Sequence, residues 1–240
     1  ITFMGAESLA VGWTPDGRIL FSSNALQMTH HGFELYTVAP EGGSPEALNL
    51  GLAFSLSFGG RGRTVLGRNY LDPARWKRYR GGLRGELWID RTGDRQFSKL
   101  VELSGNLVRP LWVKNRIYFV SDHEGHGALY SVTPEGGELR LESKHPEHYA
   151  RFPSTDGRRI VYHAGGSLYL FDPESRVTRQ VRVDYRSPRA QRNRKFVSAF
   201  RYLEAFATNG DGSALATVTR GKAHLFGSWE GPALQLGEPH

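Results

Sequence analysis

The chain has 240 residues, of which 39% are hydrophobic and 12% aromatic, so it can bury a sizeable core and is not disordered by composition. No apolar run reaches the roughly 18 residues of a membrane-spanning helix, and the lack of cysteine excludes disulfides, thiolate catalysis and cysteine-bound zinc. The net charge of +7 favours acidic partners but specifies no fold.

Two kinds of turn alternate along the chain. Tight Asp-Gly turns, in which glycine tolerates positive φ and aspartate bonds its own backbone, occur at 14–18 (TPDGR), 154–158 (STDGR) and 209–213 (NGDGS). A second turn follows a recurring Gly-x-Leu-aromatic strand, whose copies begin at Phe33, Gly85, Gly127, Gly166 and, more weakly, Lys222. The alternation indicates a repeated unit.

The runs between these turns read as strands. Residues 116–120 (RIYFV) and 158–163 (RRIVYH) are nearly continuous in apolar and β-branched residues, as in strands buried on both faces, and helical periodicity is nowhere sustained. Four strands per unit and a period of about 40 residues predict an all-β β-propeller of four-stranded blades. A sandwich or barrel need not repeat one turn order in every unit. The expected units begin near Val11, Gly51, Ser104, Glu147 and Arg186.

The number of units has a consequence for the ring. The residues before Val11 can supply at most one edge strand, so the chain holds about five blades. An arc that lacks a blade would expose apolar faces and an unpaired strand edge. We therefore expect residues 1–240 to form a single propeller domain, a fragment of a six-bladed ring whose first blade comes from residues upstream of Ile1.

The second unit carries a basic stretch, RWKRYRGGLR at 75–84, that no acid interrupts. It lies between the second and third strands of its blade, so propeller topology places it on the face opposite the Asp-Gly turns. Two interpretations stay open: a docked loop that contacts other subunits, with arginine stems covering aromatic rings, or a direct peptide contact. The residues concerned are Arg75, Trp76, Lys77, Arg78, Tyr79, Arg80 and Arg84.

A second basic segment, RSPRAQRNRK at 186–195, joins the fourth unit to the fifth. By topology it belongs to the same face, where two cationic segments would focus a positive potential over the channel mouth. We expect that face to attract carboxylate-bearing peptide ends or acidic subunits, although a mobile solvated loop is the favoured interpretation of the second segment. Nucleic acid is a rival ligand, but no RRM, KH or zinc-finger pattern supports it.

Histidines gather in loops, at 30–31, at 121–127 (SDHEGHG) and at 145–148 (HPEH). No helix fixes their spacing, so ordinary turn chemistry is favoured over a zinc site. No Gly-x-Ser-x-Gly elbow occurs, and GGRGR at 59–63 lacks the Lys-Ser/Thr of a phosphate loop. The sequence predicts no catalytic residue, no metal and no cofactor in this chain.

Four stretches together resemble the tricorn proteases, in the smaller, six-bladed N-terminal propeller of that family. The similarity runs from about Val11 to the chain end, and Trp-Lys-x-Tyr-Arg-Gly-Gly is its most specific block. On this alignment Ile1 falls in or just before the second blade. The stretches are LNLG at 48–51, RWKRYRGGLRGELWI at 75–89, RIYFVSDHEGHGALYS at 116–131 and ARFPSTDGRRIVYHAGGSLYLFDPE at 150–174.

The resemblance implies a part of a large cytosolic serine peptidase that degrades oligopeptides. Such enzymes have two propellers and a catalytic region interrupted by a PDZ-like domain, and they assemble as homo-hexamers. Their catalytic serine, histidine and glutamate lie far downstream, and their carboxylate-binding arginine pair would align around residues 3–6, which read FMGA here. The implied role is therefore non-catalytic: assembly, and channelling of peptides or products.

The implied partners are other domains and subunits of the same peptidase and oligopeptides, with no nucleic acid and no membrane, in the cytoplasm. Two alternatives share the propeller. A stand-alone binding propeller similar to TolB has the same turns but no need for the basic block. A gating propeller of a prolyl-oligopeptidase-like hydrolase would need a Gly-x-Ser-x-Gly elbow downstream.

Overall fold

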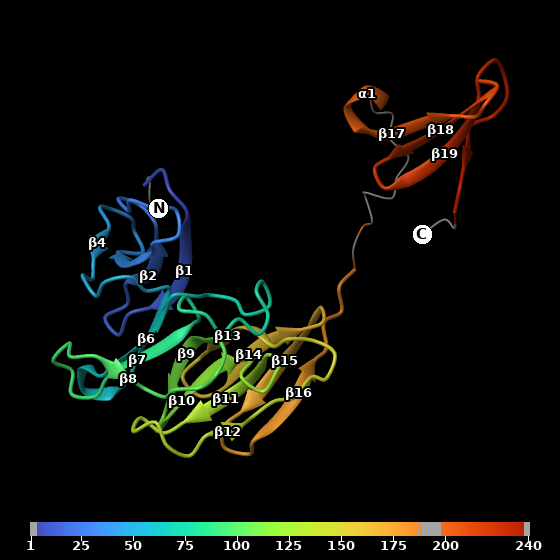
Figure 1. The fold of residues 1–240 in the computed structure, drawn as a ribbon. Helices are drawn as coiled ribbons and strands as arrows, with labels where there is room; N and C mark the ends of the chain where they lie inside the picture. The colour runs from blue at the N-terminus through green and yellow to red at the C-terminus, as the bar shows by residue number, and fades with distance from the viewer. Residues whose placement is uncertain (1–3, 187, 189–197, 238–240) are drawn as a thin grey trace. The chain divides into compact units, whose positions relative to one another are not determined.

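A computed structural model describes residues 4–186, 188 and 198–237 (Figure 1). The chain divides into two compact units, Ile1–Val183 (unit 1) and Asp184–His240 (unit 2). None of the helices in the described part of the chain has the length and apolar character that a membrane crossing requires.

Unit 1 contains four antiparallel sheets of four strands each, and in every sheet the strands are ordered as they follow in the chain. We call these sheets blades 1 to 4. Blade 1 comprises β1 (Ser8–Trp13), β2 (Ile19–Ser23), β3 (Glu34–Val38) and β4 (Glu46–Ala47). Blade 2 comprises β5 (Ser55–Phe58), β6 (Thr64–Arg68), β7 (Glu86–Asp90) and β8 (Ser98–Lys99), with a single 3-10 turn, η1 (Gly60–Gly62), between β5 and β6.

Blade 3 comprises β9 (Leu107–Val113), β10 (Arg116–Ser121), β11 (Ala128–Val132) and β12 (Arg140–Leu141), and blade 4 comprises β13 (Arg151–Thr155), β14 (Ile160–Ala164), β15 (Ser167–Asp172) and β16 (Val177–Val181). Unit 2 holds blade 5, made of β17 (Leu203–Thr208), β18 (Ala214–Thr219), β19 (Lys222–Gly227) and β20 (Leu234–Gln235), after a four-residue helix, α1 (Ala199–Tyr202).

These sheets confirm the predicted all-β fold, a β-propeller of four-stranded blades. The first four blades begin within four residues of the predicted starts. The first strand of the fifth, β17, begins at Leu203, later than the start predicted near Arg186. Residues 187 and 189–197, between these positions, lie outside the described residues. A single domain over residues 1–240 and a sixth blade stay predictions.

In unit 1 the outer strands β4, β8, β12 and β16 lie at the periphery, and β9 and β13 lie toward the middle (Figure 1). Consecutive blades of unit 1 pack face to face, which explains why the second strands of blades 1 to 3 are buried along most of their length. In β10, Ile117 and Phe119 join a buried cluster with blade 2, whereas Tyr118 and Val120 join one with blade 4. Because successive side chains of a strand point to opposite faces of the sheet, one face of blade 3 packs on blade 2 and the other packs on blade 4.

The glycine of the Gly-x-Leu-aromatic repeat allows the next blade to approach. A Cβ on Gly85 would lie 2.6 Å from the carbonyl oxygen of Leu107. Instead, the Leu107 N–H donates to the Gly85 carbonyl (3.0 Å), and the Ala150 N–H donates in the same way to Gly127 (2.9 Å). The leucine of the repeat is buried, as Leu87 shows with 1% exposure. The repeat therefore encodes blade-to-blade packing as well as a strand.

Candidate functional site

The β6–β7 connection (69–85) contains the whole predicted basic block and lies between the second and third strands of its blade, as predicted. It extends over blades 3 and 4. A hollow of about 670 Å³ is lined by this loop, by the β10–β11 and β14–β15 connections and by the segment that joins blade 3 to blade 4. The structure therefore brings second-to-third-strand loops and an inter-blade connection together on one face of unit 1.

Asp72 fastens the loop to blade 4. Its carboxylate is buried (5% exposed) and accepts hydrogen bonds from Arg151 Nε, at 3.2 Å to Oδ1 and 3.1 Å to Oδ2, and from the Ala74 N–H at 3.1 Å. Arg151 Nη2 also pairs with Asp72. Because Arg151 opens the first strand of blade 4, this contact joins two blades that are not neighbours in the chain.

Asp122 fastens the same loop to blade 3. Its buried carboxylate accepts the Arg78 N–H (2.7 Å) and the Asn106 N–H (2.8 Å). The Asn106 side-chain oxygen accepts the Gly85 N–H at 3.0 Å. Arg78 has φ of 59°, a backbone conformation that is uncommon for a residue other than glycine. The backbone at the basic block is thus held in one position by buried acceptors.

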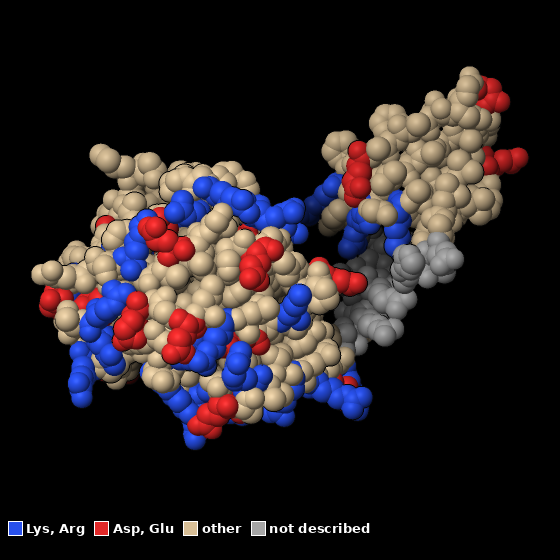
Figure 2. Space-filling model, turned by 60° about the horizontal axis from the view of Figure 1, so that its bottom comes forward, with Lys and Arg blue, Asp and Glu red and all other residues tan. Residues whose placement is uncertain are grey.

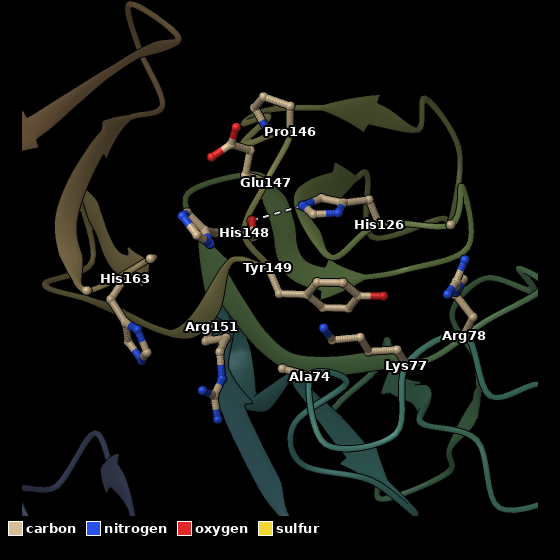
Figure 3. A pocket seen from close by; sticks show the side chains of 13 residues that line it. Ala74, Lys77, Arg78, His126, Pro146, Glu147, His148, Tyr149, Arg151 and His163 are labelled. Atoms are coloured by element: carbon tan, nitrogen blue, oxygen red, sulfur yellow. Dashed lines mark hydrogen bonds between the residues drawn. The ribbon is translucent and has the colours of Figure 1, made fainter. Parts of the chain in front are cut away.

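Lys77 and Arg78 are the members of the predicted block that line the hollow. The Lys77 ammonium lies 5.1 Å from the centroid of the Tyr149 ring, a cation–π distance, and Figure 3 shows Tyr149 between Lys77 and the 146–147 segment. Tyr149 is 8% exposed, and its hydroxyl has no hydrogen-bond partner among the described residues. Burial, together with Asp122, raises the pKa of Tyr149 against the opposing effect of Arg78.

The other members of the block lie outside the hollow. Trp76 and Tyr79 stack at 4.0 Å between ring centroids, and Trp76 is half exposed. Arg80 and Arg84 line a second hollow of about 340 Å³, and Arg84 forms a long ion pair with Glu86 at 3.8 Å. Across the described part of the chain, no ion pair involves Arg75, Lys77, Arg78 or Arg80. Of the second basic segment, only Arg186 and Pro188 fall inside the described residues.

Unit 1 as a whole carries basic side chains interspersed with acidic ones, as Figure 2 shows for one face. On that face, the basic side chains therefore do not form one continuous positive surface. The unpaired cations of the β6–β7 loop make the hollow a local exception. Its lining includes three lysine and arginine side chains, Lys77, Arg78 and Arg151, and one carboxylate, Glu147.

The histidines that line the hollow, His126, His148 and His163, serve local packing. His126 Nε2 lies 2.9 Å from the His148 carbonyl oxygen, and the His148 ring lies where a Cβ on Gly165 would approach it to 2.2 Å. His163 stacks on Phe152 at 5.4 Å, and burial together with Arg151 lowers its pKa. No group of three metal-ligating side chains is present within residues 4–186, 188 and 198–237.

One serine–histidine contact occurs near the loop: Ser121 Oγ and His123 Nδ1 are 3.0 Å apart. The two residues are neighbours on the same turn, where Ser121 Oγ also accepts the His123 N–H. Ser121 is 0% exposed, so its hydroxyl cannot reach a substrate. A nucleophile has to be accessible as well as paired with a base, and this contact is therefore structural.

Two residues that the sequence reasoning missed belong to the same region. Arg109 and Phe152 occupy matching irregularities of β9 and β13, with φ of 52° and 49°, and the Arg109 guanidinium lies 4.4 Å from the Phe152 ring centroid. Burial lowers the pKa of Arg109 to about 10, and its Nε is buried without a partner among the described residues. Each residue precedes a proline, Pro110 or Pro153, which favours extended backbone. The sequence therefore carried no signal for the left-handed conformation that the structure shows.

Comparison with known proteins gives the family. Residues 1–177 match the family model described as the tricorn protease N-terminal β-propeller domain. The tricorn protease homolog of Saccharolobus solfataricus is 37% identical over 99% of this chain and 22% of its own length. The tricorn protease of Thermoplasma acidophilum is 36% identical over 89% of this chain and 20% of its own length.

A crystal structure of the tricorn protease superposes with a TM-score of 0.79 at 33% identity, and the match covers all of this chain and 24% of that one. The chain thus spans about a fifth of the length of the curated relatives described here. The family model covers well over half of the chain, and its relatives agree over nearly all of it. The chain belongs to the family of tricorn protease N-terminal β-propeller domains.

Proposed function

We propose that the chain is the non-catalytic propeller portion of a tricorn-like serine peptidase that degrades oligopeptides. The observation that carries the proposal is the match over the whole chain, at 33% identity, to 24% of the tricorn protease chain. Because this chain corresponds to about a quarter of the tricorn protease chain, the larger part of such a protein remains for catalysis. In the proposal, the propeller serves assembly and the channelling of peptides or products.

Two features of unit 1 support a role in handling peptides. The β6–β7 loop, which carries several cations, is held by the buried carboxylates of Asp72 and Asp122. Arg109 of β9 and Phe152 of β13 are in cation–π contact, and these two strands lie toward the middle of the unit (Figure 1). Such cations and such an aromatic ring would interact with the carboxylates and apolar side chains of short peptides.

The partners are other domains and subunits of the same peptidase, in a homo-hexamer, together with oligopeptides, and the protein works in the cytoplasm. Among the basic block, Arg75, Arg80 and Arg84, with Trp76 and Tyr79, would contact a neighbouring domain or subunit. Exposed arginine and aromatic side chains are enriched in such contacts.

The proposal is tested on the full-length protein that carries this chain. A fluorophosphonate probe labels activated serines, and mass spectrometry locates the label. We expect hydrolysis of fluorogenic tripeptides, a labelled serine outside residues 1–240, and a hexameric mass by analytical ultracentrifugation. Label on a serine of this chain would overturn the non-catalytic role. Absence of both label and hydrolysis would overturn the peptidase assignment.

A further inference from the structure

We propose that β16, the outer strand of blade 4, is a docking edge for an extended, acidic segment of a partner protein, which would add to the sheet as a further strand. The inference goes beyond the proposed function and does not depend on the peptidase assignment. The supporting observations are the length and regularity of this edge, the pattern of side chains on its exposed face, and its unpaired cations.

β16 is longer than the other outer strands in the described part of the chain. It has five residues, Val177–Val181, whereas β4, β8, β12 and β20 have two residues each. Very short outer strands are one way in which proteins prevent a sheet edge from pairing with other chains. β16 lacks this protection, and it forms the edge of blade 4 at the periphery of unit 1 (Figure 1).

The main chain of β16 is regular enough to pair with a further strand. All five residues pair with β15 in an unbroken register, from Val177 opposite Asp172 to Val181 opposite Leu168, and no proline interrupts the strand. In an antiparallel pair, alternate residues direct their N–H and C=O groups to the neighbouring strand, and the residues between them direct theirs outward. Among the described strands, β16 pairs with β15 alone. Its outward groups are therefore available to an extended segment that adds to the sheet edge.

The side chains of β16 define what the added strand should carry. Thr178 lies opposite Phe171, on the face that packs against blade 3. Val177, Arg179 and Val181 lie on the other face, because side chains alternate along a strand. On that face Val177 is 56% exposed, and Arg179 is exposed as well. A segment with an acid between two apolar residues at alternate positions would match it, since apolar and opposite-charge pairs across strands stabilise antiparallel sheets.

The cations of the edge favour such a segment over a second copy of this chain. Arg179 and Arg182 are exposed and form no ion pair with any described residue, whereas Arg176 is engaged by Glu142 at 3.0 Å. Two copies of β16 paired about their centres would place two Arg179 side chains opposite each other, and like charges in that position destabilise a sheet. Charge complementarity therefore selects an acidic partner.

The test measures hydrogen–deuterium exchange of the full-length protein, which reports where a peptide binds. The probe is the acetylated and amidated peptide TVTETVT, in which glutamate lies between two valines at alternate positions. We expect it to slow the exchange of 176–183, and we expect TVTKTVT to need about a tenfold higher concentration for the same protection. Equal protection by the two peptides, or no protection by TVTETVT, would overturn the inference.

A third peptide tests the main-chain pairing. TVTETVT that is N-methylated at every residue keeps its charge but donates no main-chain hydrogen bond, so it should not protect 176–183. Protection by the methylated peptide equal to that by TVTETVT would show that charge alone attracts the peptide, and it would overturn the docking edge.

Charge reversal locates the contact. Arg179→Glu should weaken protection by TVTETVT about tenfold and strengthen protection by TVTKTVT to a similar extent, an exchange of preference that a misfolded variant cannot produce. Arg158→Glu is the matched control, because it reverses an exposed cation in the Asp-Gly turn of the same blade, and it should leave the preference unchanged. An unchanged preference in Arg179→Glu would overturn the assignment of this residue.

The protein without peptide distinguishes other occupants of the edge. We expect part of 176–183 to exchange rapidly, because the outward N–H groups have no acceptor. If all of these amides exchange slowly and become faster on dilution, a second copy of the chain covers the edge and the inference is wrong. If they stay slow at every dilution, another part of the same protein covers the edge, which would also overturn the inference.

Discussion

Asp72 and Arg151 join blades 2 and 4 of unit 1 across 79 positions of the chain, with Arg151 Nε 3.1 Å from Asp72 Oδ2. The carboxylate is 5% exposed, whereas the arginine side chain keeps 35% of its surface exposed. Together with the Arg78–Asp122 hydrogen bond, this contact holds the long β6–β7 loop over blades 3 and 4. It is the part of the site that can be tested most directly.

Asp72→Ala removes the partner of Arg151 and the acceptor of the Ala74 N–H. We expect local stability of segment 69–85 to fall by about 2 kcal/mol, less than for a fully buried pair because Arg151 is partly solvated. Native-state hydrogen exchange of that segment measures the effect. Glu46→Ala is the control: it breaks the exposed Arg18–Glu46 pair and should cost less than about 0.5 kcal/mol. If hydrogen exchange of 69–85 were unchanged in Asp72→Ala, the Asp72–Arg151 contact would not hold the loop.

Gly85→Ala places a methyl group 2.6 Å from the Leu107 carbonyl oxygen, at the backbone contact between blades 2 and 3. Relief requires the two blades to separate, so we expect a loss of about 1–3 kcal/mol in the free energy of unfolding. The measurement is the urea denaturation midpoint. Gly82→Ala, in the same loop with no atom within 4 Å of the added carbon, should change it by less than about 0.5 kcal/mol. Equal effects of the two substitutions would refute the packing role of Gly85.

Stability should decrease when the pH falls below the ordinary histidine pKa of 6.5. Burial lowers the pKa of His123, of His145 and of His163 in the folded state; the neighbouring His126 and His148 add to this effect at His145, and Arg151 adds to it at His163. At a pH below 6.5 the unfolded chain then binds more protons than the folded one. The neutral buried histidines therefore contribute their full share to the free energy of unfolding above pH 6.5, and this share is lost as the pH falls through their lowered folded-state pKa values. Urea midpoints between pH 7.5 and 5.5 measure this. His145→Gln should flatten the profile, and an unchanged slope would count against His145.

Two buried tyrosines should respond differently to loss of the hydroxyl. The Tyr149 hydroxyl has no described partner, whereas the Tyr162 hydroxyl lies 2.8 Å from His145 Nε2. We expect Tyr149→Phe to leave the free energy of unfolding unchanged or to raise it by up to about 1 kcal/mol, because an unsatisfied polar group is removed. Tyr162→Phe should lower it by about 1 kcal/mol. The opposite order in denaturation experiments would show that the Tyr149 hydroxyl is satisfied in solution.

The fold was predicted largely from short-range patterns. The Asp-Gly turn at 154–158 appears as predicted between β13 and β14, where the Asp156 carboxylate accepts the N–H groups of Arg158 and Arg159. Residues 116–120 form a strand buried on both faces. These features depend on residues a few positions apart, so a linear reading detects them.

The site was predicted only in part. Topology placed the Arg75–Arg84 block with the inter-blade connections, but of that block only Lys77 and Arg78 line the hollow. Asp72 and Tyr149, which hold or support them, carry no motif, and Asp122 lay in the 121–127 stretch that was interpreted as turn chemistry. Each is an ordinary residue until packing brings it beside its partner, 79 positions away for Asp72 and 44 for Asp122.

The sequence by itself determined the repeated four-stranded unit and its turns, and the motifs that resemble the tricorn family. Strand alternation and turn geometry are local, so the chain order is enough to read them. Only the tertiary structure decided which cations stay unpaired and which are neutralised. That outcome depends on burial and on charges from distant blades, because a carboxylate removed from water needs a partner wherever the fold supplies one.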